Sequence, residues 1–207
     1  MRLGIYGGAF NPPHLGHLIL AQDAHAQLGL DRVLLVPYAE PSHRQLEDDP
    51  GGELRLAMCE LAVGRDARFG VSRIELDRGG PSFTIDTLRD LGRRSPDDEL
   101  YLLLGGDQAA ALGSWHSPEE VVSLARLAVA ERDEWRREEI MERLGGLCPP
   151  ERVRFFEMPR VEISSSSVRR RARAGQPIRY LVPDSVADFV AARSLYGLSA
   201  PAGAVSR

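Results

Sequence analysis

The segment Gly7-Gly8-Ala9-Phe10-Asn11-Pro12-Pro13-His14-Leu15-Gly16-His17 carries the strongest indication of the fold of this chain. It follows a short apolar run, residues 2–6, that predicts a buried strand, and it opens a segment, residues 16–28, whose apolar side chains recur at helical spacing. In open α/β sheets, ligands bind beyond the carboxyl ends of the strands, at helix N-termini. A strand, a glycine-rich turn and a helix in direct succession therefore predict an α/β fold with a phosphate site at this turn.

The turn carries two histidines that suit a phosphate site. His14 and His17 are three residues apart, so on one helical turn they would face the same way, with Gly16 leaving space between them. Two imidazoles at the positive end of a helix fit a polyphosphate whose charge grows during a reaction, and Gly7 and Gly8 let the backbone approach it closely. Two other interpretations remain open: a zinc site with a further ligand, or a purely structural pair.

Outward from this turn, strand-like and helix-like segments alternate. Strands are predicted at 32–36, 69–74, 100–104, 127–130 and 153–157. Helices are predicted at 53–63, 84–91, 134–144 and from 164 onward, with another that starts at a capping Ser117 and has Pro118 in its first turn. The alternation predicts α/β architecture: one Rossmann-like nucleotide-binding domain over residues 1–198, with a parallel sheet, helices on both faces and a small helical C-terminal part at about 164–198. Residues 199–207 are predicted to be a disordered tail.

The composition excludes several chemistries. The 207 residues carry 26 basic and 30 acidic side chains, for a net charge of −4, and every basic side chain is arginine. Without lysine, the chain cannot form a Walker-type loop or use Schiff-base or pyridoxal chemistry. Phosphate must then be handled by Arg, His, backbone N–H groups, helix N-termini or a metal.

The charge, the cysteine content and the hydropathy limit the kinds of partner that the chain can have. The mild acidity argues against a nucleic-acid partner, and no apolar run approaches the roughly 18 residues of a membrane span. The two cysteines, Cys59 and Cys148, indicate neither a disulfide framework nor a cysteine zinc site, and Cys59 is expected to be a small core residue. We expect a cytoplasmic protein with no membrane partner.

A second candidate anion site is Ile163-Ser164-Ser165-Ser166-Ser167-Val168-Arg169. Serine hydroxyls and free N–H groups at a helix start can bind phosphate oxygens, and Arg169, one turn later, can neutralise them. The alternative is that Ser164 only caps the helix while the following arginines form a solvated face. For Arg171 and Arg173 we prefer the solvated face.

Both motifs resemble a known superfamily. Residues 8–17 look like the GxFxPxHxGH signature of the nucleotidyltransferases related to class I aminoacyl-tRNA synthetases, and residues 163–169 resemble their ISxTxIR motif, with Asn11 and Ser166 where Asp and Thr are usual. The synthetases use a lysine-rich second motif instead, which this chain cannot have. The resemblance implies that His14, His17 and Arg169 are catalytic. It implies an ATP site made of Gly7, Gly8, Ala9, Phe10, Gly16, His17, Gly105, Asp107, Ile163, Ser164, Ser166 and Arg169.

The middle of the chain is similar to the bacterial nicotinate-nucleotide adenylyltransferases, and this similarity extends over residues 1–198. Pro41-Ser42-His43-Arg44 resembles their PPHK/R segment, residues 80–88 their PSYTxDTL segment, and residues 104–107 their strand-end GxD. Residues 181–186 and the pair Leu195-Tyr196 also match. Without the family resemblance, we would interpret Trp115 as a half-buried core residue and Asp107 as a helix cap. The resemblance implies an acceptor site made of His43, Arg44, Phe83, Thr84, Trp115 and Arg132.

The activity implied by the resemblance is the transfer of AMP from ATP to nicotinate mononucleotide. Mg²⁺ is expected to arrive with ATP, with no metal site formed by the protein alone. A homo-oligomer is left open. One alternative is a transferase of the same fold with another acceptor, such as nicotinamide mononucleotide, phosphopantetheine or glycerol phosphate. A second alternative, from a different class, is a non-catalytic nucleotide sensor, which would be expected to have lost a histidine of the turn or Arg169.

Overall fold

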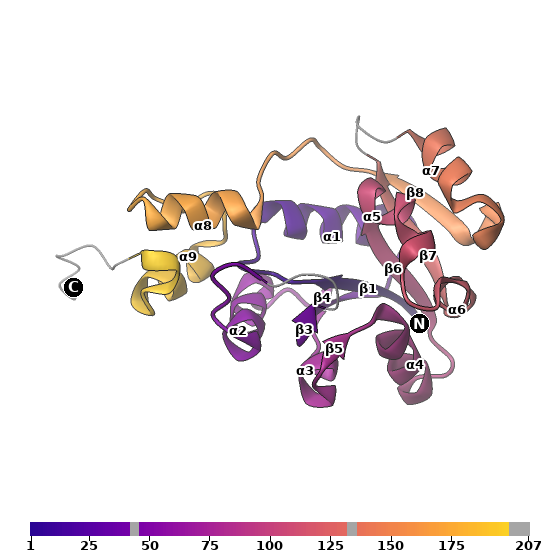
Figure 1. Ribbon diagram of the computed structural model, residues 1–207, viewed down its shortest axis with the longest axis horizontal. Coiled ribbons are helices and arrows are strands. Elements are labelled where there is room, and N and C mark those ends of the chain that lie inside the picture. The colour runs from indigo at the N-terminus through magenta and orange to yellow at the C-terminus, as the bar shows by residue number, and fades with distance from the viewer. Residues whose placement is uncertain (42–45, 132–135, 199–207) are drawn as a thin grey trace.

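The computed structural model describes residues 1–41, 46–131 and 136–198 of the chain (Figure 1). Its main sheet is parallel throughout. In spatial order, the strands are β4 (Phe69–Val71), β2 (Arg32–Pro37), β1 (Arg2–Gly8), β6 (Glu99–Gly105), β7 (Ala125–Glu131) and β8 (Val153–Glu157). A second, two-stranded parallel sheet pairs β3 (Glu40–Pro41) with β5 (Pro81–Ser82).

Helices cover both faces of the main sheet, which confirms the α/β prediction. In Figure 1, α1 lies above the sheet, and α2, α3 and α4 lie below it. The α-helices are α1 (Leu15–Leu28), α2 (Gly52–Val63), α3 (Ile74–Arg78), α4 (Thr84–Arg94), α5 (Gly106–Ala110), α6 (Pro118–Leu124), α7 (Arg137–Leu144), α8 (Ser165–Arg173) and α9 (Asp184–Ala192). Short 3₁₀ turns occur at Leu112–Ser114, Gly145–Leu147, Pro150–Arg152 and Leu195–Gly197.

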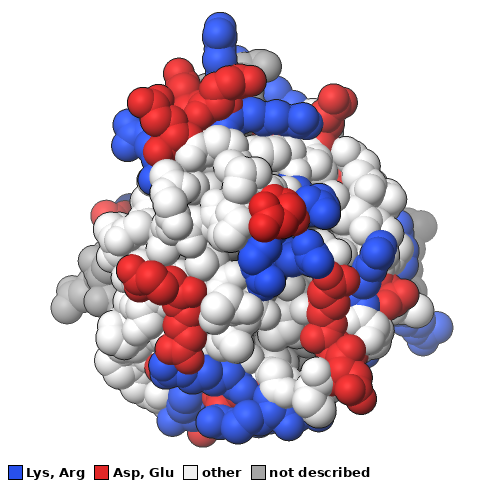
Figure 2. Space-filling model, turned by 90° about the vertical axis from the view of Figure 1, so that its right-hand side faces the viewer, with Lys and Arg blue, Asp and Glu red and all other residues white. Residues whose placement is uncertain are grey.

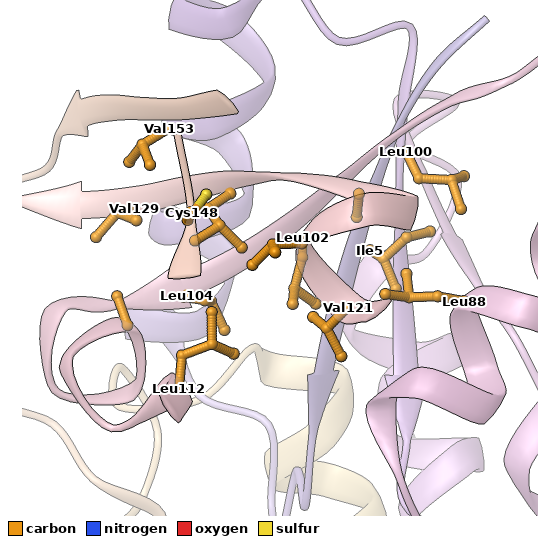
Figure 3. Close-up of a cluster of buried hydrophobic side chains, with 14 of the residues drawn as sticks. Ile5, Leu88, Leu100, Leu102, Leu104, Leu112, Val121, Val129, Cys148 and Val153 are labelled. Atoms are coloured by element: carbon orange, nitrogen blue, oxygen red, sulfur yellow. The ribbon is translucent and has the colours of Figure 1, made fainter. Parts of the chain in front are cut away.

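Alternate residues of β6 supply two separate cores. Leu100, Leu102 and Leu104 pack with residues of α4 and α6, such as Leu88 and Val121 (Figure 3). Tyr101 and Leu103 point the other way and pack against α1. Because successive side chains of a strand face opposite sides and both sides are covered, the strand is an unbroken apolar run in the sequence.

The C-terminal helices have a buried cluster of their own. Val168 of α8 and Val186 and Val190 of α9 pack with Met58 of α2. The neighbouring Cys59 is fully buried against Phe10 and Leu35, which confirms its interpretation as a core residue. The predicted tail, residues 199–207, lies outside the described residues. α8 and α9 therefore share an apolar contact with α2.

Two sequence predictions about element ends are wrong. The strand predicted to reach residue 74 ends at Val71, and Ile74 begins α3, with its N–H donated to Ser72 Oγ at 3.3 Å. Ile74 is buried in the core, and an apolar run this short does not distinguish a strand from a helix. Ser117 precedes α6 as expected, but its φ of 50° places it in the left-handed region and its hydroxyl caps nothing. A capping serine needs an extended backbone to reach the first amides.

Charged side chains of both signs are interleaved on the face shown in Figure 2. Ion pairs also join separate elements of the fold, such as Arg89 with Glu120 at 2.5 Å and the N-terminal amine with Asp98 at 2.7 Å. Exposed pairs of this kind contribute little each, about 0–1 kcal/mol. None of the helices in the described ranges has the length and apolarity required to cross a membrane.

The strand order places a crevice between β1 and β6. From β1 the chain moves to β2 and β4 on one side, then returns to β6 on the other side and continues to β7 and β8. In open α/β sheets, ligands bind where the order reverses in this way, outside the carboxyl ends of the strands. β1 ends at Gly8 and β6 ends at Gly105, so both glycine-containing motifs meet at this point.

Candidate active site

Three adjoining cavities lie over the carboxyl ends of β1 and β6. The first, which we call the histidine–arginine cavity, has a volume of about 560 Å³ and is lined by His14, His17, Ser164, Ser166 and Arg169 among others. The second, the tryptophan cavity, measures about 630 Å³ and is lined by Tyr38, Phe83, Thr84, Trp115 and His116 among others. A central cavity of about 340 Å³ shares Ala9 and Asp107 with the first and Thr84 and Trp115 with the second.

The structure brings together the site residues predicted from sequence wherever it describes them. His43, Arg44 and Arg132 lie outside the described residues. The others each line at least one of the three cavities: Gly7, Gly8, Ala9, Phe10, His14, Gly16, His17, Phe83, Thr84, Gly105, Asp107, Trp115, Ile163, Ser164, Ser166 and Arg169. Segments more than 150 residues apart in the chain thus line adjoining cavities that share residues.

The glycine-rich turn is supported from beneath by Phe10. This side chain is buried, and its backbone has a φ of 47°, a conformation uncommon for a residue with a Cβ. A Cβ on Gly8 would lie 3.1 Å from the Phe10 ring, a tight contact that glycine avoids, so the turn packs closely onto the ring. The same ring meets His17 edge-on, with 5.1 Å between the centroids. Phe10 thereby positions both the turn and a histidine.

The two histidines face the same way, as predicted, but only His17 is helical. His14 is the N-cap residue of α1 in an extended conformation, and its ring stacks on that of His17 with 3.6 Å between centroids. The space at Gly16 is taken by the His14 ring itself, because a Cβ there would lie 3.1 Å from its Cε1 atom. Among the described residues, no group of three His, Cys, Asp or Glu could hold a metal ion together with this pair.

One hydrogen bond determines the proton position on His17. The backbone N–H of His14 donates to His17 Nδ1 at 3.0 Å. A ring nitrogen that accepts a hydrogen bond is unprotonated, so the neutral ring carries its proton on Nε2. In this tautomer His17 is a hydrogen-bond donor through Nε2, as the ligand of an anionic oxygen must be.

Two helices present their N-termini to the histidine–arginine cavity. The residues at the start of α1 and of α8 line it, and neither helix has an acidic residue in its first turn. Each of the other described α-helices does have one. An acidic side chain there would neutralise the positive end of the helix dipole, so its absence leaves two such ends available to an anion.

The serine-rich motif combines capping with site formation. Ser164 does cap α8, since its Oγ accepts a hydrogen bond from the Ser167 N–H at 3.1 Å, and it lines the cavity as well. Ser165 Oγ donates to the Pro12 carbonyl at 2.9 Å, which ties α8 to the histidine turn. Arg171 and Arg173 are exposed, as expected of a solvated face, although Arg173 also pairs with Asp48.

Arg169 is held in place by carbonyl and carboxylate oxygens. The residue is only 8% exposed, and its Nη1 donates to the Asn11 carbonyl at 3.0 Å. Its Nη2 lies 3.5 Å from Glu47 Oε2, and its Nε lies 3.5 Å from Asp48 Oδ2. These two ion pairs are long, so the guanidinium is oriented without being tightly bound by either carboxylate.

Asn11 shows why an amide fits this turn. Its Nδ2 donates to the Glu47 carbonyl at 3.0 Å, and its Oδ1 accepts from the Tyr196 hydroxyl at 2.7 Å. A carboxylate could not make the first of these bonds, because it has no donor. Burial raises the pKa of Tyr196, which keeps the phenol in its donating form. Sequence reasoning missed this pair, which joins residues 185 positions apart.

The tryptophan cavity is formed by short elements after β5 and β6. Trp115 follows the 3₁₀ turn Leu112–Ser114. It is half-buried against the main core, as the interpretation without the family expects, and it also lines the tryptophan cavity. The rings of Phe83 and His116 lie 4.6 Å apart in the same cavity. The cavity therefore offers several aromatic faces to a flat ring. Sequence reasoning missed Tyr38, Gln108 and His116 there.

Asp107 is not a helix cap. It lies within the first turn of α5, whose N-cap residue is Gly105 without a side-chain hydrogen bond. A Cβ on Gly105 would lie 2.7 Å from Asp107 Oδ1, so glycine makes room for this carboxylate. Asp107 is exposed and lines both the central and the histidine–arginine cavities. It is thus available to a ligand that extends across the two.

Glu75 is a buried carboxyl that the sequence did not single out. Its Oε1 accepts a hydrogen bond from Thr87 Oγ1 at 2.6 Å, which fixes the first turns of α4 behind Thr84. Burial raises the pKa of Glu75, with hydrogen bonds from Ser82 and Thr87 acting in the opposite direction. The residue lines the central cavity. It supports the wall that carries Phe83 and Thr84.

A parallel sheet with paired glycine turns, histidines and a serine–arginine motif at its switch point defines the class of nucleotidyltransferases. The profile of the family described as cytidylyltransferase-like matches residues 5–171. A probable nicotinate-nucleotide adenylyltransferase of Corynebacterium kroppenstedtii is 41% identical over 99% of this chain and 95% of its own length. One from Geobacillus thermodenitrificans is 40% identical over 95% of this chain and 86% of its own. The chain belongs to this family, the nicotinate-nucleotide adenylyltransferases of the cytidylyltransferase-like group.

Solved structures agree on the fold. The nicotinic acid mononucleotide adenylyltransferase of Plasmodium falciparum, solved in complex with APC and in complex with NaAD, has a TM-score of 0.77 to this chain in both structures. At 18% and 19% identity, it covers 96% of this chain and 98% of its own. A putative nicotinate-nucleotide adenylyltransferase from Vibrio parahaemolyticus has a TM-score of 0.67 at 18% identity, over 97% of this chain and 99% of its own.

Proposed function

We propose that this protein transfers AMP from ATP to nicotinate mononucleotide, giving nicotinate adenine dinucleotide and pyrophosphate in NAD biosynthesis. Family membership supports the reaction, and the shape of the cleft supports the pair of substrates. We expect it to act in the cytoplasm.

The observation that carries the proposal is the continuity of the three cavities. A cavity with two helix N-termini that have no acidic residue in their first turns, two histidines and Arg169 suits a triphosphate. The tryptophan cavity suits a flat pyridine ring. The central cavity, lined by the backbone of Gly7 and Gly8, connects them and provides room for the two phosphates that react. One site thus accommodates two substrates with their phosphates adjacent.

The proposed step is a direct displacement. A phosphate oxygen of nicotinate mononucleotide attacks the α-phosphorus of ATP in line, the bond from that phosphorus to the bridging oxygen breaks, and pyrophosphate leaves with the electron pair. The nucleophile is already an anion, so no general base is required. Catalysis then consists of positioning and charge stabilisation. We assign the α-phosphate to His17 Nε2 together with His14, and the leaving phosphates to Ser166 and Arg169. We assign binding of the acceptor phosphate to His43 and Arg44.

Mg²⁺ is proposed to accompany ATP rather than to occupy a site of the protein's own. Bound to the triphosphate, the ion would neutralise charge on the leaving pyrophosphate. The donor set fits this arrangement, because the described part of the chain offers single carboxylates at the cleft, such as Asp107, and no cluster of three metal ligands. Asp107 is the residue we assign to a water or ribose hydroxyl of the bound nucleotide.

Pyrophosphate release tests the proposal directly. The purified protein is given ATP with nicotinate mononucleotide, with nicotinamide mononucleotide or with phosphopantetheine, at equal concentrations. We expect turnover with the first to exceed the other two. Preference for the amide or for phosphopantetheine would assign the same fold to a different acceptor. Nucleotide binding without turnover on any of the three would support the sensor interpretation.

Replacing Trp115 with alanine is expected to raise the KM for nicotinate mononucleotide about tenfold, with the KM for ATP changed less than twofold. Stacking of an aromatic side chain on a base is worth about 1–3 kcal/mol, and the smaller pyridine ring lies at the low end of this range. The other tryptophan, Trp135, lies outside the described residues and is not used as a control. The comparison variant is instead His116→Ala, which removes another aromatic side chain from the same cavity. A large rise in the KM for ATP would mean that Trp115 has a structural role instead.

A further inference from the structure

Arg55 is a buried arginine that no motif of the sequence singles out. It lies on α2, its side chain is 0% exposed, and it is among the largest fully buried side chains of the described residues. Removing a charged guanidinium from water is unfavourable unless its N–H groups find acceptors. Its position away from solvent therefore requires specific oxygen partners, and the structure shows three.

The three partners of Arg55 come from three different segments. Its Nε donates to Asp49 Oδ1 at 2.9 Å, its Nη1 donates to the Ala9 carbonyl at 3.1 Å, and its Nη2 donates to the Ala39 carbonyl at 3.1 Å. Asp49 supplies the compensating negative charge. The other two partners are main-chain oxygens, so their recognition depends on backbone position alone.

The Ala9 carbonyl belongs to the turn proposed to hold ATP. Ala9 directly follows β1, and it lines both the central and the histidine–arginine cavities. Its carbonyl precedes Phe10, whose positive φ shapes the turn. A donor placed on this carbonyl fixes the orientation of the peptide between the glycine pair and the ring that packs against His17.

The Ala39 carbonyl belongs to the segment that forms the acceptor side. Ala39 follows Tyr38, a residue of the tryptophan cavity, and its N–H donates to Ser82 Oγ at 2.9 Å, next to Phe83 and Thr84. The following β3 pairs with β5, which ends at Ser82. The Ala39 peptide is thus held from one side by the acceptor wall and from the other by Arg55.

We propose that Arg55 is a positioning residue that fixes the ATP-binding turn at Ala9 relative to the acceptor-binding segment at Ala39. This inference rests on the proposed function. The two Nη atoms of one rigid, planar guanidinium each bind one of the two carbonyls, so the fork sets the spacing between the segments. A displacement between two bound substrates depends steeply on that spacing, because a shift of about 1 Å can cost on the order of 10²-fold in rate.

The test compares Arg55→Lys with the unaltered protein. A lysine ammonium keeps the charge near Asp49 but lacks the planar fork that spans both carbonyls. We expect kcat to fall by roughly 10- to 50-fold, while the KM for ATP and the KM for nicotinate mononucleotide each change less than threefold. The matched control is Arg73→Lys, for which we expect an unchanged kcat. Arg73 is an exposed arginine that pairs with Glu53 and Asp77.

In Arg55→Ala, added guanidinium is expected to restore part of the lost kcat.

The outcomes separate this inference from the proposed function. Absence of turnover by the unaltered protein with nicotinate mononucleotide refutes the proposed function. Normal turnover by the unaltered protein together with an unchanged kcat in Arg55→Lys overturns the positioning role, as does a loss confined to KM. Should both Arg55 variants fail to fold, Asp49→Ala decides, because it leaves the fork to both carbonyls in place and removes, at a partly exposed position, the partner of Nε together with the acceptor of the Gly51 N–H. We expect a kcat several-fold lower, and an unchanged value would overturn the inference.

Discussion

Replacing His17 with alanine is expected to lower kcat by a factor of 10² or more. Loss of one preorganised donor to a developing oxyanion has an effect of this size. The hydrogen bond from the His14 N–H to Nδ1 holds the His17 ring as an Nε2 donor, and the stacked His14 ring and Phe10 keep it in place. Because this donor is assigned to charge that grows in the transition state, kcat and kcat/KM should fall together.

The matched control is His25→Ala, the same substitution near the other end of α1. His25 lies in the last turn of that helix and is not among the residues lining the three cavities. Its kcat should stay within a factor of two of the unaltered value. The assay is run at a temperature at which thermal denaturation shows His17→Ala to be folded. Near-normal turnover there would refute the assignment of His17 as a donor to the α-phosphate.

Replacing Arg169 with alanine is expected to lower kcat/KM for ATP by about 10²-fold. Hydrogen bonds to charged groups are worth roughly 1.5–3 kcal/mol, and Arg169 can offer more than one to the leaving phosphates. Its bond to the Asn11 carbonyl aims the guanidinium at the cavity, while its ion pairs at 3.5 Å with Glu47 and Asp48 are long enough to be exchanged for phosphate oxygens. Arg169→Lys keeps the charge without the fork and should be intermediate.

Steady-state kinetics with varied ATP measures this effect, and Arg170→Ala provides the control. Arg170 is the exposed neighbour on α8, and its removal changes the net charge equally. If Arg170→Ala lowered kcat/KM as much as Arg169→Ala, the effect would come from net charge rather than from a specific phosphate contact. A fall in thermal stability alone, with kinetics preserved, would make Arg169 a structural residue.

The fold was largely predictable because its signals are local. The central strands are buried on both faces, so β6 is an apolar run that ends in Gly105, and α1 and α2 begin within one residue of their predicted starts. The errors concern short elements. β3 and β5 have two residues each, and the helix at Ile74 was read as strand, because four or five residues are too few for a period to show.

The site was predictable where residue types carry its chemistry. The histidines of the first phosphate motif and Arg169 of the second line one cavity, and the aromatic acceptor residues line another. The predicted cap at Ser117 was wrong because capping depends on backbone angles rather than on residue type. The roles proposed for His43, Arg44 and Arg132 stay predictions, as these residues lie outside the described ranges.

The fold class, the two phosphate motifs and the exclusion of every lysine-dependent mechanism follow from the amino-acid sequence alone, because each depends on composition or on residues close together in the chain. Only the tertiary structure showed that Arg55 joins Ala9 to Ala39, that Tyr196 donates to Asn11, and that Thr87 is fixed by Glu75. These contacts span 12 to 185 positions, and two of the Arg55 partners are main-chain carbonyls, which every residue possesses. A group common to all residues leaves no mark in the sequence, so its partner appears only when the chain is folded.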